Sequence, residues 1–445
     1  MERAAATKQA ATKQETGRAA CGIDRPVRGT GRHIAVIAPP VPGHFRPLSV
    51  LAGALAERGH RVTFVHMPDA RRLVEGGAGF HAVGEDDYGA GALDRYGRRL
   101  ARASGPWGLP AMIRATAGIT RMLLGELPDA LRRIGAEAVI AESAEPAGAL
   151  VARKLGLPFV TSHTGLPLNR EPGVPPPYLG WPYRDDVGGR RRNAWGYRIS
   201  DWLLRPIDGA VSRAARAWGL EEEPGFSPLL QVAQCVGGLD FPRADPPPAF
   251  RYCGPFRAMA APAPDLPGDL PLVFCSLGSL QGDRAGVFAA MAAACADVGA
   301  RAVIGHGGRL SERAAARIGH GALVRDFWPQ EAVLARARAA LLHGGFNTVL
   351  DALAAGVPMV VAPIAFEQPA TAARVARTGA GRVLTGRVTR AKLRRDLGAV
   401  LNDPAHRAAA GRLRGEIDAA GGVALAADLV DEALRTGRTP APSPA

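Results

Sequence analysis

The chain has 445 residues, a length that suggests two or three domains. Hydrophobic residues make up 47% and charged residues 22% of it, which is ordinary for a globular protein and excludes a disordered, collagen-like or small disulfide-bonded protein as a description of the whole. The formal net charge is +14, from 55 Lys and Arg against 41 Asp and Glu. Because the arginines are scattered and only 6% of residues are aromatic, we expect no nucleic-acid partner.

The sequence predicts a cytoplasmic protein. It contains no uninterrupted apolar run of ~20 residues and no apolar segment near its start, so it predicts neither a transmembrane helix nor a secretory signal. The five cysteines are widely spaced without a C-x-x-C pair, which favours free thiols in a reducing compartment. Residues 1–30 and 436–445 lack apolar periodicity and are expected to be disordered tails.

The first half of the chain alternates strand and helix signals. The apolar run at residues 32–38 is typical of a strand buried on both faces, and residues 39–44 form a loop rich in Pro. Residues 45–58 then show helical spacing of Leu and end before Gly59, a common helix terminator. Further strands are expected at residues 61–66, 138–141 and 157–160, and a helix at 146–155. Such strand–helix–strand units are typical of a parallel sheet.

The alternation restarts after residues 257–268, which are rich in Pro and Ala and predict a linker. We expect an N-terminal domain over residues 31–256 and a C-terminal domain over 269–435, with the last helix free to pack back on the first domain. Strands are expected at residues 272–275, 301–304, 339–342 and 359–362, helices at 284–298 and 347–355, and helices alone from there to about 435. The fold class is therefore α/β, with two doubly wound parallel-sheet domains in tandem. They would face a cleft at the carboxyl ends of their strands, where ligands bind.

Two segments of the N-terminal domain depart from this alternation. Residues 107–127 are apolar with few charges, and suit either ordinary core packing or a helix that contacts lipid or lines an apolar acceptor pocket. Residues 166–178 hold too many prolines for a helix or a central strand. A long irregular loop of this kind is often functional.

His44 is the first candidate catalytic residue. It follows the first strand and therefore lies at the carboxyl end of the sheet, where an imidazole can accept a proton near neutral pH. Glu142 follows a later strand at the same edge. A carboxylate beside the imidazole would fix its tautomer and stabilise its charged form, so the two residues suit a His–acid dyad.

A second set of candidates lies in the C-terminal domain and suits a diphosphate. Glycines at strand-to-helix turns let backbone N–H groups approach an anion, and the helix N-terminus adds a favourable dipole. Side chains beside these turns add hydrogen-bond donors and acceptors. The candidates are Ser276, Gly278, Ser279, Trp328, Pro329, Gln330, His343, Gly344, Gly345, Asn347, Thr348, Asp351, Glu367 and Gln368. No P-loop occurs, and we find no residue set that predicts a metal site.

The segments Trp328-Pro-Gln, His343-Gly-Gly-Phe-Asn-Thr-Val-Leu-Asp351, Gly356-Val-Pro-Met and Glu367-Gln368 resemble the nucleotide-sugar motif of the family 1, UDP-dependent glycosyltransferases. The resemblance covers about residues 32–430 and implies the GT-B fold. Within the family, Gly43-His-Phe-Arg-Pro, Leu166-Pro-Leu-Asn-Arg-Glu-Pro and Pro363-Ile-Ala-Phe-Glu-Gln-Pro are most similar to the zeaxanthin glucosyltransferases.

The resemblance also implies a role for each matching residue. Trp328 would stack on uracil, with Gln330 on the base or ribose, and Asp351 would bind the ribose where the family usually has Glu. His343, Asn347, Thr348, Ser276 and Ser279 would bind the diphosphate, and Glu367 and Gln368 the transferred sugar, although the family more often has Asp at the first of these two positions. His44 would be the base, and Glu142 stands where the family usually has Asp.

These roles imply an inverting transfer of a sugar, with glucose expected, from a UDP-sugar to a lipophilic hydroxyl acceptor, without a metal or another cofactor. The acceptor expected is a hydroxylated carotenoid such as zeaxanthin, and residues 107–127 and 171–177 would form its side of the cleft. The basic surface leaves peripheral association with a membrane open. Two alternatives remain: transfer to a macrolide, polyketide or other secondary metabolite, and a non-catalytic nucleotide-sugar-binding protein. A nicotinamide oxidoreductase is disfavoured because the G-x-G-x-x-A at Gly77 does not lie between a strand and a helix.

Overall fold

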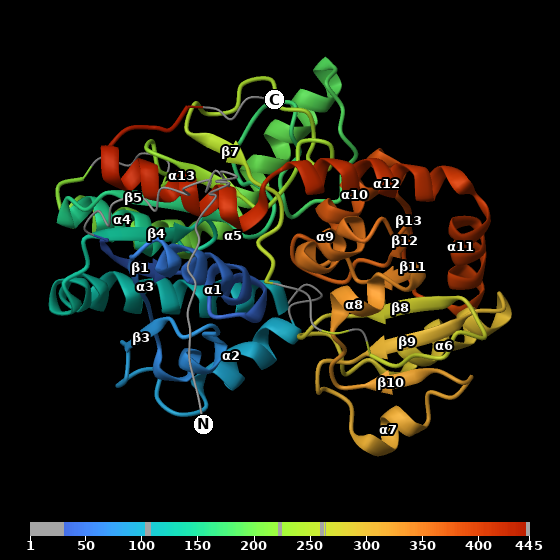
Figure 1. Ribbon diagram of the computed structural model, residues 1–445. Helices are drawn as coiled ribbons and strands as arrows, with labels where there is room; N and C mark the ends of the chain where they lie inside the picture. Colours follow the sequence, from blue (N-terminus) through green and yellow to red (C-terminus); the bar gives the residue numbers. More distant parts are fainter. Residues whose placement is uncertain (1–30, 103–107, 221–224, 259–261, 263, 442–445) are drawn as a thin grey trace, which may run out of the picture.

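The computed structural model describes residues 31–102, 108–220, 225–258, 262 and 264–441. The expected tail at residues 1–30, the last four residues of the tail expected at 436–445, and Trp107 lie outside this range. Residues 436–441 are described: Thr436 ends a helix, and the Pro440 carbonyl accepts a hydrogen bond from Arg251. The described chain forms two parallel sheets covered by helices, so the expected pair of doubly wound domains is confirmed (Figure 1). One sheet has seven strands in the order β3-β2-β1-β4-β5-β6-β7, and the other has six in the order β10-β9-β8-β11-β12-β13.

The N-terminal sheet follows the predicted alternation. Its central strands are buried along their whole length, which is why they read as continuous apolar runs. Its strands are β1 (His33–Ile37), β2 (Arg61–His66), β3 (Gly79–Ala82), β4 (Ala138–Glu142), β5 (Phe159–His163), β6 (Gln231–Ala233) and β7 (Phe250–Tyr252). Its helices are α1 (Pro42–Glu57), the 3-10 helix η1 (Pro68–Leu73), α2 (Ala92–Ala101), α3 (Gly108–Ile134), α4 (Pro146–Leu155) and α5 (Val187–Ala217).

The C-terminal sheet repeats the same plan. Its strands are β8 (Leu272–Ser276), β9 (Arg301–Gly305), β10 (Leu323–Arg325), β11 (Ala337–Leu342), β12 (Met359–Val361) and β13 (Gly381–Val383). Its helices are α6 (Ala285–Asp297), α7 (Glu312–Ala316), α8 (Gln330–Leu334), α9 (Phe346–Ala354), α10 (Gln368–Thr378), α11 (Arg390–Asn402) and α12 (Pro404–Ala419). The strand order reverses between β1 and β4 in one sheet and between β8 and β11 in the other. These switch points are where doubly wound sheets bind ligands.

The last helix, α13 (Gly422–Thr436), packs against α1 of the N-terminal domain. Its apolar side chains, including Val430 and Leu434, are part of the N-terminal core. At the edge of this contact, Arg58 pairs with Asp428 at 2.6 Å. The end of the chain therefore joins the two domains a second time, beyond the linker.

A buried ionic cluster also joins the domains. Asp240 is fully buried and accepts hydrogen bonds from Arg374 of α10 at 2.9 Å and from Arg243 at 2.7 Å. Arg243 in turn binds the carbonyl oxygen of Asn169, in the proline-rich loop, at 2.9 Å. Removing one partner of such a cluster would leave an uncompensated buried charge. The cluster therefore holds α10 against the proline-rich loop.

Three expectations from the sequence are wrong in detail. His44 does not precede the first helix but lies in its first turn, because Pro42 occupies a position where its missing N–H costs nothing. Residues beyond 359–362 are not all helical, since β13 intervenes; a three-residue strand is too short to show periodicity. The strand expected at residues 157–160 runs instead from Phe159 to His163. Of the two alternatives for residues 107–127, ordinary core packing is confirmed for residues of α3 such as Ile119, Met122 and Leu123.

Candidate active site

The two predicted catalytic residues lie side by side at the β1–β4 switch point. Because β1 and β4 are neighbours in register, the start of α1 and the end of β4 meet at the same edge of the sheet. His44 Nδ1 lies 3.2 Å from the Oε1 atom of Glu142, which is completely buried. The extra methylene of Glu, compared with Asp, is accommodated because Glu142 is still the last residue of the strand.

Thr164 is a third member of this group that the sequence reasoning missed. Its hydroxyl lies 2.7 Å from His44 Nδ1 and donates a hydrogen bond of 2.9 Å to Glu142 Oε1. Thr164 follows β5, the next strand in the sheet, which continues to His163, beyond the end at residue 160 that its apolar run indicated. The polar end of β5, Thr161-Ser-His-Thr164, was the available signal.

The electrostatics of the pair suit a general base. Burial alone would raise the pKa of Glu142, but the charge and hydrogen bond of His44, the Ala144 N–H and the Thr164 hydroxyl lower it to about 2. Burial opposes protonation of His44, yet the carboxylates of Glu142 and Glu367 together raise the pKa of its imidazole above 6.5. With Nδ1 held by Glu142 and Thr164, Nε2 is the nitrogen left to take a proton from a hydroxyl group.

The second switch point holds the glycine-rich turns. His343, at the end of β11, donates its backbone N–H to the Ser276 carbonyl at the end of β8. Gly278 and Gly345 flank its ring: a Cβ atom at either position would lie 2.6 or 2.5 Å from His343 Nε2. Gly344 has a φ of 90°, and a Cβ atom there would lie 2.9 Å from Val361 and 3.0 Å from Gln368. Glycine is therefore required on steric grounds around this imidazole.

His343 is a neutral hydrogen-bonding group. Burial lowers the pKa of its imidazole to about 4, and its Nδ1 atom has no partner among the described residues. The ring can therefore offer an N–H to a phosphate oxygen, whereas positive potential comes from the N-terminus of α9. Ser279 and Thr348 are half-buried beside these turns, and Ser276 is buried with its hydroxyl accepting a hydrogen bond from the Gly278 N–H at 3.2 Å.

Asn347, predicted for the diphosphate site, contacts the other domain through both atoms of its side-chain amide. Its side-chain nitrogen donates to the carbonyl oxygen of Gly43 at 2.8 Å, and its oxygen accepts from Gln234 at 2.7 Å. Both partners belong to the N-terminal domain. In this structure Asn347 therefore bridges the domains beside His44.

The predicted base and ribose residues surround the start of α8. Trp328 donates its ring N–H to the Ile304 carbonyl at 3.0 Å, and the guanidinium of Arg325 lies 4.2 Å from its ring centre. Pro329 caps α8, and Gln330, its first residue, donates a hydrogen bond to Asp351 of α9. The structure thus brings Trp328, Gln330 and Asp351 together.

The predicted sugar residues lie at the N-terminus of α10. The Gln368 side-chain oxygen accepts the N–H groups of Ile364 and Ala365, each at 2.9 Å, and so shapes the preceding loop. Phe366 adopts a φ of 57°, which is unusual for a bulky residue. Burial raises the pKa of Glu367, which also interacts with the charges of His44 and Glu142. The charge of Glu367, in the other domain, therefore interacts with both members of the predicted catalytic pair.

Tyr178, in the proline-rich loop, is a further residue at this site that the sequence did not single out. Its side chain is 43% exposed, and the charges of Glu367 and Glu142 act on its hydroxyl, whose pKa is raised chiefly by desolvation. Two residues later, Gly180 contacts Pro369 of α10. The proline-rich loop thus reaches the point where both domains meet, as its composition suggested.

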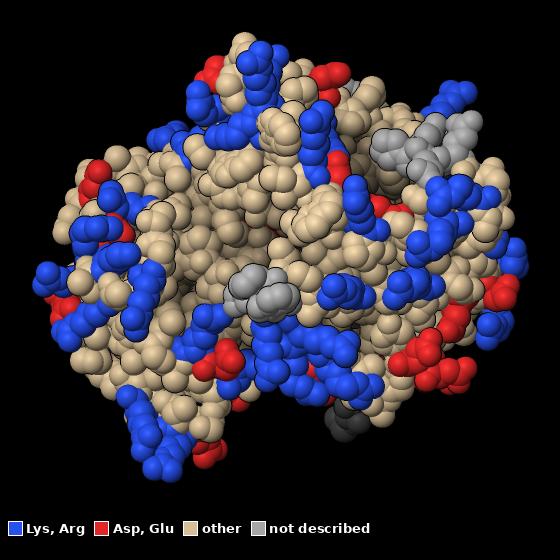
Figure 2. Space-filling view, turned by 180° about the vertical axis from the view of Figure 1, so that it is seen from behind, with Lys and Arg blue, Asp and Glu red and all other residues tan. Residues whose placement is uncertain are grey.

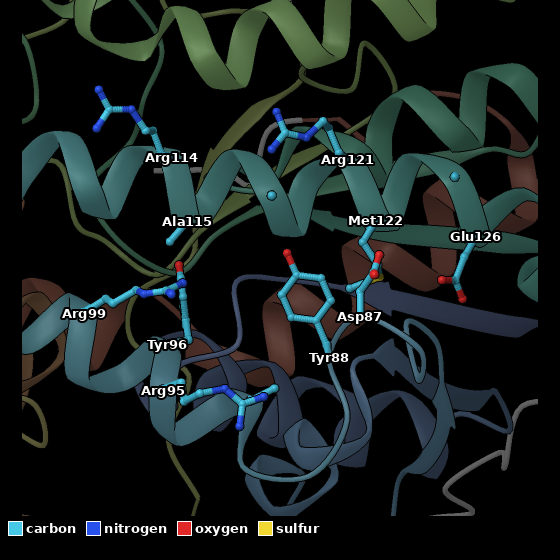
Figure 3. Close-up of a pocket in the computed structure, with 13 residues that line it drawn as sticks. Asp87, Tyr88, Arg95, Tyr96, Arg99, Arg114, Ala115, Arg121, Met122 and Glu126 are labelled. Atoms are coloured by element: carbon cyan, nitrogen blue, oxygen red, sulfur yellow. The ribbon is translucent and has the colours of Figure 1, made fainter.

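A pocket of about 700 Å³ elsewhere does not coincide with this site. It lies between α2 and α3, and Figure 3 shows Tyr88 and Tyr96 rising toward α3. Arg95, Arg99, Arg114 and Arg121 also line it, and none of the predicted site residues does. Its charged lining does not suit an apolar acceptor. Within the described residues, no group of three or more His, Cys, Asp or Glu side chains is arranged to hold a metal ion.

Comparisons with known proteins agree with this geometry. Residues 226–415 match the family described as "UDP-glucoronosyl and UDP-glucosyl transferase". The zeaxanthin glucosyltransferase of Pantoea ananas is 37% identical over 91% of this chain and 97% of its own, and that of Pseudescherichia vulneris is 37% identical over 90% and 98%. The solved kitacinnamycin glycosyltransferase superposes with a TM-score of 0.70 at 23% identity, covering 91% of this chain and 99% of its own.

The structural likeness confirms the GT-B fold, and the identity to these relatives establishes the family. The structure places the histidine–acid pair at the switch point of one domain and the glycine-rich turns at that of the other. The chain therefore belongs to the UDP-dependent glycosyltransferases and is a UDP-glycosyltransferase of the GT-B fold.

Proposed function

We propose that this enzyme transfers glucose from UDP-glucose to a hydroxyl group of a lipophilic acceptor of the zeaxanthin type, with inversion at the anomeric carbon. The observation that carries the proposal is the His44–Glu142 pair, with its Nδ1–Oε1 distance of 3.2 Å and its fully buried carboxylate. The charge of Glu367, in the other domain, acts on the same imidazole. The names of the two relatives at 37% identity support the acceptor class.

In the proposed mechanism His44 Nε2 takes the proton of the acceptor hydroxyl as that oxygen attacks the anomeric carbon. Glu142 and Thr164 hold the ring by Nδ1 and stabilise the imidazolium that forms. The bond to UDP breaks on the opposite side of the sugar. His343, Ser276, Thr348 and the N-terminus of α9 then stabilise the charge on the departing diphosphate through N–H and O–H donors. A single displacement of this kind inverts the anomeric centre.

For the donor, we propose that Trp328 stacks on uracil while Gln330 and Asp351 bind the ribose, and that Glu367 and Gln368 bind the glucose hydroxyls. The side-chain amide nitrogen of Gln368 and the carboxylate of Glu367 offer a donor and acceptors at one place, which suits neighbouring hydroxyl groups. Gly278, Ser279, Gly344, Gly345 and Pro329 shape the same site through the backbone.

For the acceptor, we propose that the proline-rich loop around Tyr178 forms one wall of the cleft. Its prolines provide apolar surface with a preset backbone, and its contact with Pro369 brings that surface to the sugar end of the donor site. A cytoplasmic enzyme with such an acceptor would work at a membrane surface. No helix of the described chain is long and apolar enough to cross one.

A macrolide or other secondary metabolite is the alternative acceptor. Demethyllactenocin mycarosyltransferase of Streptomyces fradiae is 29% identical over 90% of this chain, so the same scaffold is shared with an enzyme of that name. A non-catalytic binding protein is the other alternative; the contact between His44 Nδ1 and the buried carboxylate of Glu142 favours the enzyme over it.

The test measures UDP release from UDP-glucose, with zeaxanthin in detergent or a macrolide, and identifies the product by mass and the anomer by NMR. A zeaxanthin product one or two hexoses heavier, in the β configuration, is expected. If only the macrolide received a sugar, the acceptor would be assigned to that class instead. If UDP bound but neither acceptor was glycosylated, the non-catalytic binding protein would be favoured.

A further inference from the structure

An exposed apolar stripe runs along the N-terminal half of α5. Among the large apolar side chains most exposed in the described chain are Trp195 at 64%, Ile199 at 51% and Trp202 at 60%. Their spacing of four and three residues places them on one face of the helix, each about one turn from the next. Large apolar side chains gathered on one exposed face, unlike scattered ones, mark a site of contact with a partner or a membrane.

The same stripe is edged by arginines. Arg191, Arg198 and Arg205 repeat every seven residues and therefore follow one line along the helix beside the two tryptophans. All three are exposed, and none forms an ion pair with a described carboxylate, although Arg198 lies over the Trp195 ring. The helix contains seven Arg and two acidic residues, Asp201 and Asp208. Asp201 forms an ion pair with Arg170 of the proline-rich loop.

The opposite side of this helix packs on the acceptor wall. Gly196 contacts Trp181 and Pro176, and the Tyr197 hydroxyl donates to the Val174 carbonyl at 3.1 Å. Figure 1 shows this half of α5, in green, standing out at the top of the molecule, and Figure 2 shows Lys and Arg side chains on that projection with the surface hollowed below it. The exposed stripe thus lies on the side of α5 that faces away from the proline-rich loop.

We infer that this face of α5, made by Trp195, Ile199, Trp202, Arg191, Arg198 and Arg205, docks the protein on an anionic lipid surface. Tryptophan favours the level of the lipid headgroups, where its ring is buried and its N–H stays hydrated. Arginine at the edge of the stripe complements acidic headgroups. The three exposed charges beside the stripe are all positive, which an anionic headgroup layer complements along the whole stripe.

The inference does not depend on the acceptor's identity, because docking is measured without donor or acceptor. The full chain is sedimented with vesicles of phosphatidylcholine alone and of phosphatidylcholine with phosphatidylglycerol. We expect binding to the mixed vesicles that weakens as salt is raised. The double variant Trp195→Ser/Trp202→Ser and the triple variant Arg191→Ser/Arg198→Ser/Arg205→Ser should each lose at least about tenfold in apparent affinity.

Matched controls keep the test specific. Phe327 is 62% exposed in the C-terminal domain, so Phe327→Ser removes a similar aromatic surface elsewhere. Arg313→Ser/Arg317→Ser/Arg412→Ser removes the same charge from exposed positions in the other domain. Both controls should bind vesicles like the wild type, and all variants should keep its unfolding temperature. The inference would be overturned if the stripe and control variants lost vesicle binding equally. It would also be overturned if the wild type did not bind vesicles but formed a dimer that the double Trp variant dissociates.

Discussion

The guanidinium of Arg257, in the segment that links the two domains, forms an ion pair with the carboxylate of Asp351 on α9. It also donates to the Asn347 carbonyl at 3.1 Å. Burial raises the pKa of Asp351, and Arg257 and the Gln330 hydrogen bond act against that rise. The linker therefore supplies a countercharge that limits the rise in the pKa of the proposed ribose-binding carboxyl group.

Arg257→Gln should raise the KM for UDP-glucose about tenfold with little change in kcat, because Asp351 without its counter-charge is protonated more readily and accepts fewer ribose hydrogen bonds. Steady-state kinetics at varied donor concentration measures this. Arg301→Gln, which breaks the ion pair of Arg301 with Asp269, is the control. A lower KM in Arg257→Gln would instead show that the guanidinium competes with the ribose.

His44→Ala should lower kcat by about 10²–10⁴-fold, since general-base catalysis contributes that much. Its affinity for UDP, measured by calorimetry, should match the wild type because His44 belongs to the other domain. A variant with unchanged kcat would remove His44 as the base.

The pH dependence of kcat/KM should depend on Glu142. His44 acts as a base only when neutral, and its pKa is raised above 6.5, so the rate should climb with pH through that raised value and then level off. In Glu142→Gln the stabilising charge is lost. The inflection should then move to lower pH, and the plateau should fall about 100-fold because the imidazolium is no longer stabilised. Measuring kcat/KM of the wild type and of Glu142→Gln from about pH 5 to about pH 9 tests the position of the inflection and the height of the plateau. An inflection that stays in place would mean that Glu142 does not set the pKa of His44.

Glu145→Gln should stabilise the protein at high pH. Glu145 is buried at the start of α4, and burial raises its carboxyl pKa from 4.5 to about 7. A folded-state pKa above the unfolded one means that the folded state binds the proton more tightly, so stability falls as pH rises from about 4.5 to about 7.

The glutamine variant removes this loss, by roughly 2–3 kcal/mol above neutral pH. It keeps an oxygen acceptor for the Ala147 N–H. Its unfolding temperature should exceed that of the wild type near pH 8 and match it near pH 5. The exposed Glu85→Gln should differ at neither pH, and equal behaviour of the two variants would contradict the prediction.

Gly345→Ala should weaken UDP binding about 10–100-fold. The added Cβ would lie 2.5 Å from His343 Nε2, so the imidazole must move, and overpacking of this kind typically costs ~1–3 kcal/mol. Gly286→Ala, which meets no atom within 4 Å in α6, is the matched control. Calorimetry with UDP separates them, and equal affinity in both would show that the turn has room to adjust.

The sequence by itself determined the scaffold and the place of the site. Fully buried parallel strands must be apolar throughout, so β1, β4, β8 and β11 are visible as short apolar runs, and the residues that follow each run lie at one edge of a sheet. His44, Glu142, Ser276 and His343 were predicted in this way, and the structure places them at the two switch points. The strands β6, β7, β10 and β13 escaped prediction because each has three residues and includes a Gln or an Arg, so it forms no apolar run. The equally short β12 was visible because all of its residues are apolar.

Only the tertiary structure decided which side chains meet. Thr164 contacts His44, which is 120 residues away, and Asn347 donates a hydrogen bond to Gly43, which is 304 residues away. Arg257 forms an ion pair with Asp351 from a linker whose sequence shows no periodicity. The tertiary structure also buries apolar residues of α3 in the core and leaves the tryptophans of α5 exposed. Local spacing shows which residues share a face, whereas the packing of distant elements decides whether that face is covered and which charges balance each other.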